Sequence, residues 1–152
     1  MRKKIFIGLL GVVVVALLYG LVDHFILKAP SHPGEKTIYI TFVDDINKET
    51  IIDKQAYKTK AETLGAFFDE GHEEFTVILD GGGELGRAIV GMIIDRQGFT
   101  SDFASATGPW IMFGSDNNES CVANGYCLGI DNFPIADGDR FVFEYSDASI
   151  FD

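Results

Sequence analysis

The amino-acid sequence predicts an α+β domain, in which one helix packs on a mixed sheet, behind a single N-terminal transmembrane helix. Three observations lead to this fold class: a long uncharged run near the N-terminus, several short segments with alternating or apolar side chains, and one segment with helical spacing. Two strands, one helix and then several strands is the element order of an α+β domain. With 152 residues, 47% of them hydrophobic, the chain is long enough to bury one core.

The N-terminal run predicts a membrane anchor. Residues 5–22, IFIGLLGVVVVALLYGLV, carry no charge and would form a helix about 27 Å long, enough to cross a bilayer core. Because the bases of MRKK precede the run, the positive-inside rule places the following domain outside the cytoplasm, as a single-pass protein of the cell membrane. A cleavable signal peptide is the alternative, and it also gives an extracytoplasmic domain. The expected parts are a cytoplasmic basic tail (1–4), a transmembrane signal-anchor (5–27), a linker (28–36), a domain (37–147) and a tail (148–152).

The domain opens with two predicted strands. Residues 37–43, TIYITFV, place Ile38, Ile40 and Phe42 on one face, which is typical of a half-buried strand. A turn at residues 44–47 leads to a less regular strand over residues 49–58. Four further strands are expected, over residues 75–79, 87–94, 108–113 and 140–145.

One soluble helix is predicted between the second and third strands. Thr59, with Glu62 three residues later, matches a capping box, and Gly71 is placed to end the helix. The residues that share its apolar face are Ala61, Leu64 and Phe68. We expect this face to pack on the sheet.

The two cysteines, Cys121 and Cys127, are separated by VANGY, in which Asn124-Gly125 supplies a turn. In an oxidising compartment such a close pair predicts a small-loop disulfide, with two reduced thiols as the alternative. The three histidines lie far apart and match no zinc spacing, so we expect no metal site from these residues.

The charge distribution excludes some partners. Residues 1–28 hold four bases and one acid, whereas the remaining residues hold eight bases and 22 acids, a net charge of −14. A domain this acidic repels phosphate backbones, which argues against nucleic-acid binding, and it has no basic face for anionic lipid. Cationic partners remain open, and so does calcium at the turns formed by residues 115–120 and 137–139.

Four segments occur in an order that resembles a known family. They are TLGAFFDEG (63–71), GRAIVGMIID (86–95), GPWIMF (108–113) and GIDNFPIADGDRFVFEY (129–145). Together they resemble the bacterial surface domain family, of unknown function, that is related to the C-terminal domain of transcobalamin and intrinsic factor. The resemblance implies a β-grasp-like fold. The stretch FGSDNN (113–118) departs from the Tyr-x-Asn-Gly often found in the family, at the place where the vertebrate relatives contact cobalamin.

Two functional classes follow. The first is a tethered binding module for a small molecule, corrinoid-like, or for a glycan, with a concave pocket lined by Trp110, Phe113, Tyr126 and Phe133. The second is a cell-surface protein–protein interaction or adhesion module without a small ligand, which predicts a flat exposed patch or an open sheet edge.

Catalysis has little support in the sequence. There is no GxSxG nucleophile motif, the cysteine pair is best interpreted as oxidised, and no carboxylate stands in an apolar segment that would raise its pKa. We therefore expect a protein that is not an enzyme and that carries no cofactor.

Overall fold

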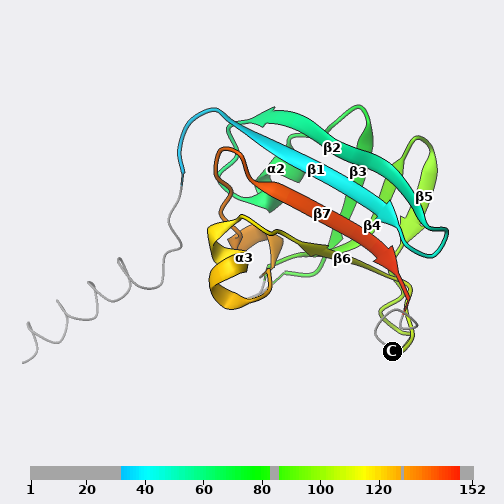
Figure 1. Ribbon diagram of the computed structural model, residues 1–152. Helices are drawn as coiled ribbons and strands as arrows, with labels where there is room; N and C mark the ends of the chain where they lie inside the picture. Colours follow the sequence, from blue (N-terminus) through cyan, green and yellow to red (C-terminus); the bar gives the residue numbers. More distant parts are fainter. Residues whose placement is uncertain (1–31, 83–85, 128, 148–152) are drawn as a thin grey trace, which may run out of the picture. The chain divides into compact units, whose positions relative to one another are not determined.

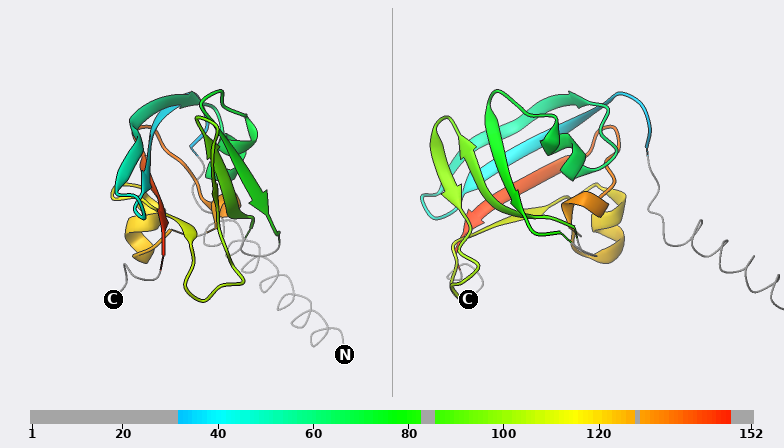
Figure 2. Two further views of the ribbon diagram at one scale, coloured as in Figure 1. Left: turned by 90° about the vertical axis from the view of Figure 1, so that its right-hand side faces the viewer. Right: turned by 180° about the vertical axis from the view of Figure 1, so that it is seen from behind.

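Two β-sheets that face each other make up most of the domain (Figures 1 and 2). The computed structural model describes residues 32–82, 86–127 and 129–147, which belong to one compact unit. The four-stranded sheet has the order β2-β1-β7-β6, with β1 (Lys36–Asp44), β2 (Glu49–Thr59), β6 (Trp110–Gly114) and β7 (Arg140–Ser146). The three-stranded sheet has the order β3-β4-β5, with β3 (Phe75–Asp80), β4 (Ala88–Ile94) and β5 (Gln97–Thr100). The helices of the described residues are α2 (Leu64–Asp69), α3 (Glu119–Asn124) and the 3-10 helix η1 (Ile130–Asn132).

β1 lies at the centre of the four-stranded sheet, antiparallel to β2 and parallel to β7. Its residues Ile38, Ile40 and Phe42 are fully buried, as the alternation predicts. At its end the Asp44 carboxylate accepts hydrogen bonds from the backbone N–H and the side-chain amide of Asn47, at 3.1 and 2.7 Å, which closes the turn into β2. The predicted first hairpin is confirmed.

Aromatic side chains join the two sheets and α2. Phe42 contacts Phe99 of β5 with ring centroids 4.7 Å apart, and Phe68 of α2 lies edge-on to Phe143 of β7 at 5.6 Å. Burial of one such side chain contributes about 1.5–3 kcal/mol, so these contacts hold the layers together. The largest fully buried side chains are Phe42, Phe67, Phe133, Phe141, Phe143, Ile38, Ile40, Leu64, Met92, Ile94, Ile130 and Ile135.

The helix α2 begins later than the sequence predicts. Its N-cap is Thr63, whose hydroxyl accepts a hydrogen bond from the Ala66 N–H at 3.2 Å, and not Thr59. The predicted capping box is wrong because the β1–β2 ladder extends to the pair Lys36 and Thr59. The Thr59 hydroxyl instead donates to the Glu70 carboxylate at 2.7 Å and accepts from the Ala61 N–H at 2.9 Å.

The structure also differs from the expected single sheet with one helix. The strands β3, β4 and β5 form their own antiparallel sheet, since β1 and β7 already pair on both sides within the four-stranded sheet. The four-stranded sheet is mixed, as expected, and the whole is a mixed α+β fold with much sheet and few helices.

The sequence predicts neither β5 nor the helices α3 and η1. β5 follows a two-residue turn in which Asp95 and Arg96 both have positive φ, 49° and 70°, without the Asn-Gly signature of such turns. The helix α3 includes Asn124, the first residue of the expected Asn124-Gly125 turn, and Gly125, at φ 75°, ends the helix.

The predicted basic tail, the anchor, the first part of the linker (28–31) and the C-terminal tail lie outside the described residues. Within the part of the chain that the structure describes, no helix has the length and hydropathy to cross a membrane.

Candidate functional site

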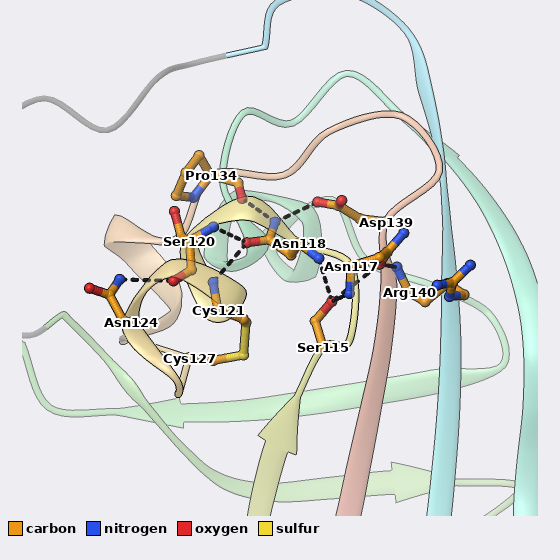
Figure 3. Close-up of a disulfide and its surroundings, with 10 residues drawn as sticks. All are labelled: Ser115, Asn117, Asn118, Ser120, Cys121, Asn124, Cys127, Pro134, Asp139 and Arg140. Atoms are coloured by element: carbon orange, nitrogen blue, oxygen red, sulfur yellow. Dashed lines mark hydrogen bonds between the residues drawn. A yellow bond between two sulfur atoms is a disulfide. The ribbon is translucent and has the colours of Figure 1, made fainter.

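A disulfide fixes the segment between β6 and β7 (Figure 3). Cys121 lies in α3 and is bonded to Cys127, with their Cα atoms 4.4 Å apart, so the predicted pairing is confirmed. The side chain of Asn118 caps α3 and accepts hydrogen bonds from the N–H groups of Ser120 and Cys121, at 3.0 and 3.3 Å. The helix is thus held at its beginning by a cap and beyond its end by a covalent bond.

The same Asn118 ties α3 to the loop before β7. Its side-chain amide donates to the Asp139 carboxylate at 2.6 Å and to the Pro134 carbonyl at 2.9 Å. Asn118 and Asp139 are both buried, and Asp139 also accepts the Ala136 N–H at 2.8 Å. These hydrogen bonds satisfy groups that would be costly to bury unpaired.

The two turns considered for calcium use their oxygens within the protein. Asn117 accepts the Arg140 N–H and donates to the Gly138 carbonyl, both at 2.9 Å, and Asp137 accepts the Thr37 N–H at 2.7 Å. Asp116 pairs with Arg140 at 3.1 Å, and the hydrogen bond from that guanidinium lowers the pKa of the Asp116 carboxyl. Over residues 32–82, 86–127 and 129–147, no three His, Cys, Asp or Glu side chains come together as a metal site.

The four residues predicted to line a pocket do not point the same way. Phe133 is fully buried, and Phe113 lies between it and Phe143, with ring centroids 5.8 Å from each. Tyr126, just past α3, is 65% exposed. Phe133 therefore lies in the core, and Phe113 is partly buried and packs against it. That these side chains contact a ligand stays a prediction.

Trp110 begins β6 and lies half-buried on the opposite side of that strand from Phe113. Its indole packs against Gly108, where an added Cβ would lie 3.1 Å from the ring atom Cε3. Of the predicted site residues, Tyr126 is exposed, and Trp110 and Phe113 are both partly buried.

The side of the four-stranded sheet that faces away from the three-stranded sheet, here called the outer face, carries exposed apolar side chains. Tyr39, Val142 and Met112 lie diagonally across β1, β7 and β6, and all three are exposed, Met112 by 49%. Trp110 continues this diagonal two residues along β6. In Figure 1, which looks onto this face, no described helix or strand lies in front of β1 and β7.

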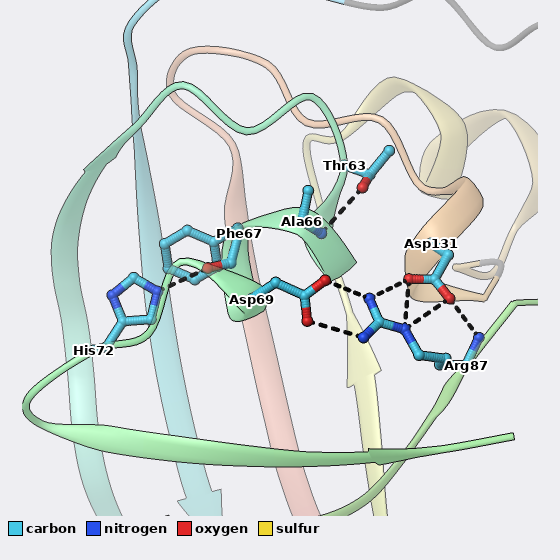
Figure 4. Close-up of polar contacts among 7 residues, drawn as sticks. All are labelled: Thr63, Ala66, Phe67, Asp69, His72, Arg87 and Asp131. Atoms are coloured by element: carbon cyan, nitrogen blue, oxygen red, sulfur yellow. Dashed lines mark hydrogen bonds and ion pairs between the residues drawn. The ribbon is translucent and has the colours of Figure 1, made fainter. Parts of the chain in front are cut away.

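Away from the outer face, Arg87 joins three elements (Figure 4). Its guanidinium bonds both carboxylate oxygens of Asp69 in α2, at 2.7 and 2.8 Å, and the Asp131 carboxylate of η1 at 2.7 Å. The Arg87 N–H also donates to Asp131 at 2.7 Å. Hydrogen bonds from Arg87 lower the pKa of both carboxyls. All three guanidinium nitrogens of Arg87 and its backbone N–H donate within the domain, which makes this network a structural clamp.

Loss of the disulfide is expected to cost about 2 kcal/mol of unfolding free energy, because a loop this short constrains the unfolded chain only modestly. The test is the double variant Cys121→Ser, Cys127→Ser, unfolded in urea and followed by the fluorescence of the single tryptophan, Trp110. A reductant should lower the stability of the wild type by the same amount and leave the double variant unchanged. A loss below about 0.5 kcal/mol would show that Asn118 alone fixes α3.

Comparisons with known proteins found no family model that matches this chain and no matching curated protein. Among solved structures, the chain is similar to a protein from Ruminococcus gnavus ATCC 29149 described as a "putative metal binding protein". The two superpose with a TM-score of 0.46 and 20% sequence identity, over 74% of this chain and 98% of the other.

Proposed function

We propose that this protein is a membrane-tethered, extracytoplasmic interaction module that binds another protein through the outer face of its four-stranded sheet. The observation that carries the proposal is the diagonal of exposed apolar side chains, Tyr39, Val142 and Met112. A row of exposed apolar side chains across one face of a sheet is a candidate for a surface that a partner covers.

The geometry favours a macromolecular partner over a small molecule. A small-molecule site needs a concave pocket, and the four side chains expected to form one are divided between the core and the surface. The outer face is a sheet surface, which suits a partner of similar breadth. That the domain binds a corrinoid or a glycan through the predicted aromatic residues stays a prediction.

Two observations support the extracytoplasmic location. The uncharged run of residues 5–22 follows a basic tail, which favours an anchor with the domain outside. The Cys121–Cys127 disulfide is of a kind that persists in oxidising compartments and is rare in the cytosol.

We also propose a β-grasp-like fold and distant membership of the transcobalamin C-terminal-like surface domains. The support is a mixed sheet in which the first and last strands, β1 and β7, are parallel neighbours, with α2 packed behind it. The four motif segments fall on α2, β4, β6 and the η1–β7 region, in the order that the resemblance implies.

The test is cysteine labelling with a membrane-impermeant maleimide. Val142→Cys probes the outer face, and Phe103→Cys is the matched control, since Phe103 is 60% exposed and lies between β5 and β6, outside the strands that form that face. We expect Phe103→Cys to react in intact cells at the rate found for the purified protein. Val142→Cys should react several-fold more slowly in cells, because the partner covers it.

Two outcomes would contradict the proposal. If neither cysteine reacts until the membrane is permeabilised, the domain is not extracytoplasmic. If Val142→Cys reacts as fast in cells as in the purified protein, no partner covers the outer face.

A further inference from the structure

β3 is an edge strand with less protection than the other edges of the described domain: it carries no lysine, and the one register shift in its pairing with β4, between Ile78 and Leu79, places the extra residue on β4. Natural proteins protect edges with lysines, bulges, short strands or covering side chains. At one edge of the four-stranded sheet, β2 carries Lys54, Lys58 and a bulge. At the other edge, the Ile111 N–H of β6 already donates to the Ser101 hydroxyl at 2.9 Å, so it does not offer a hydrogen bond to an added strand. β5, the other edge of the three-stranded sheet, has four residues. β3 has six residues, FTVILD, contains no lysine or proline, and among the described strands pairs with β4 alone.

The exposed side of the three-stranded sheet is apolar beside this edge. Ile78 of β3 is 45% exposed and lies diagonal to Ile93 of β4, which is also exposed. The Ile78 side chain packs over Gly91 of β4, where an added Cβ would lie 3.4 Å from Cδ1 of Ile78. At Gly98 of β5, an added Cβ would have no atom within 4 Å. Beside β3, this side of the sheet thus carries exposed isoleucines and two glycines, and among the described strands none pairs with the free edge of β3.

A pocket of about 480 Å3 opens beside the first residues of β3. Its walls are Phe75, Thr76 and Ile93, and its charged groups are Glu73, Glu74, Asp95 and Arg96. Within the described part of the chain, none of the three carboxylates forms an ion pair, and Glu74 accepts one hydrogen bond, from the Gln55 amide at 3.3 Å. Three carboxylates against one guanidinium leave the pocket with a net negative charge.

We propose that the edge of β3 binds an extended segment of a partner polypeptide, added as a strand, with a lysine or arginine of that segment seated in the pocket. This goes beyond the proposed function, which concerns the opposite layer of the domain. Backbone hydrogen bonds to an edge strand supply affinity, and side chains at alternate positions supply specificity. The partner segment carries a basic residue and an aliphatic residue two positions apart, the first for the pocket and the second beside Ile78.

Charge complementarity favours a basic partner over a second copy of this chain. Antiparallel pairing of two β3 strands would bring Asp80 of one copy toward Glu74 of the other, and like charges on adjacent strands are destabilising. The domain as a whole is strongly acidic, which attracts a cationic segment at long range.

The test uses the purified full chain in mild detergent and a fluorescent peptide, Thr-Lys-Thr-Val-Thr-Lys-Thr-Val-Thr, read out by anisotropy. As a strand, this peptide places lysine and valine alternately on one face. We expect saturable binding that weakens with salt. A peptide with Glu for Lys, and one with Pro at its central Thr, should bind at least about 10-fold more weakly, because the first loses the charge pairing and the second loses a backbone donor.

Two variants of the protein locate the site. Ile78→Lys places a charge on the proposed edge, and Gln97→Lys adds the same charge at β5, on the opposite edge of the same sheet. We expect Ile78→Lys to weaken peptide binding at least about 10-fold and Gln97→Lys less than about 3-fold. A triple variant, Glu73→Gln, Glu74→Gln, Asp95→Asn, should match Ile78→Lys. Circular dichroism checks that each variant folds, and since Ile78 is exposed we expect it to tolerate lysine.

The proposal is overturned by the absence of saturable binding, by equal binding of the Glu peptide, or by binding that Ile78→Lys leaves unchanged. A concentration-dependent dimer in sedimentation that Ile78→Lys abolishes would assign the edge to a second copy instead. None of these results depends on Val142 or the outer face, so this proposal and the proposed function can fail separately.

Discussion

Replacing Phe133 by alanine is expected to destabilise the domain by about 3–5 kcal/mol, the range for deleting a fully buried aromatic ring. The ring is completely buried and lies edge-on to Phe113 and Phe141, at 5.8 and 5.6 Å. Its backbone carbonyl accepts the Leu64 N–H at 3.0 Å, which places the cavity next to the first turn of α2. The measurement is urea unfolding of the purified full chain, followed by Trp110 fluorescence.

The matched control is Phe103→Ala, since Phe103 is exposed and should change the stability by less than about 0.5 kcal/mol. A Phe133→Ala protein as stable as the wild type would contradict the core assignment.

The sequence predicts well the elements whose pattern is local. The alternation in β1 and the apolar strands β3, β4 and β7 appear within one or two residues of the expected bounds. The sequence does not predict which strands pair with one another. Both sheets bury one face of each strand in the same core, so the residue pattern of 87–94 is the same whichever sheet β4 joins. β5 was missed because the turn at Asp95-Arg96 adopts positive φ without glycine or asparagine.

The candidate site shows the same limit. Phe113 and Trp110 are three residues apart in β6, so they lie on opposite faces of the strand, a consequence of the period of two. The two-residue period of a strand is known from the sequence alone, and it already argued against a pocket lined by both Trp110 and Phe113. The outer face was not predictable, since Tyr39, Val142 and Met112 come from strands whose register only the structure provides.

Arg87 was also missed, because its partners, Asp69 and Asp131, lie 18 and 44 residues away along the chain. Two glycines mark the site in retrospect. A Cβ on Gly65 would collide with the Asp131 carboxylate, and a Cβ on Gly86 would lie 3.0 Å from Cβ of Asp131. The motifs of the resembled family that contain Gly65 and Gly86 therefore have a structural explanation here, namely room for the clamp.

Replacing Arg87 by methionine is expected to lower the unfolding free energy at pH 7 by about 2 kcal/mol. The variant leaves the half-buried Asp131 without the guanidinium and brings two carboxylates together without a cation. The more exposed Asp69 contributes little to this figure, since solvent screens its ion pair. Arg87→Lys should recover less than half of the loss, because an ammonium cannot bond both carboxylates in the planar geometry that arginine offers.

The loss should depend on pH with a definite sign. Arg87 lowers the pKa of Asp69 and Asp131 in the folded state, so the stability it provides is fully present above the ordinary carboxyl pKa of about 4 and is lost as the pH falls through the lowered values. The difference between the wild type and Arg87→Met should be constant from pH 5 to pH 7 and shrink steadily below about pH 4. Urea unfolding at pH 7, 5, 4 and 3 measures it, with Arg140→Met as the control, because the exposed Arg140–Asp116 pair should contribute almost nothing at any of these values. A difference that persists undiminished at pH 3 would show that Arg87 acts by packing its aliphatic stem and not through its charge.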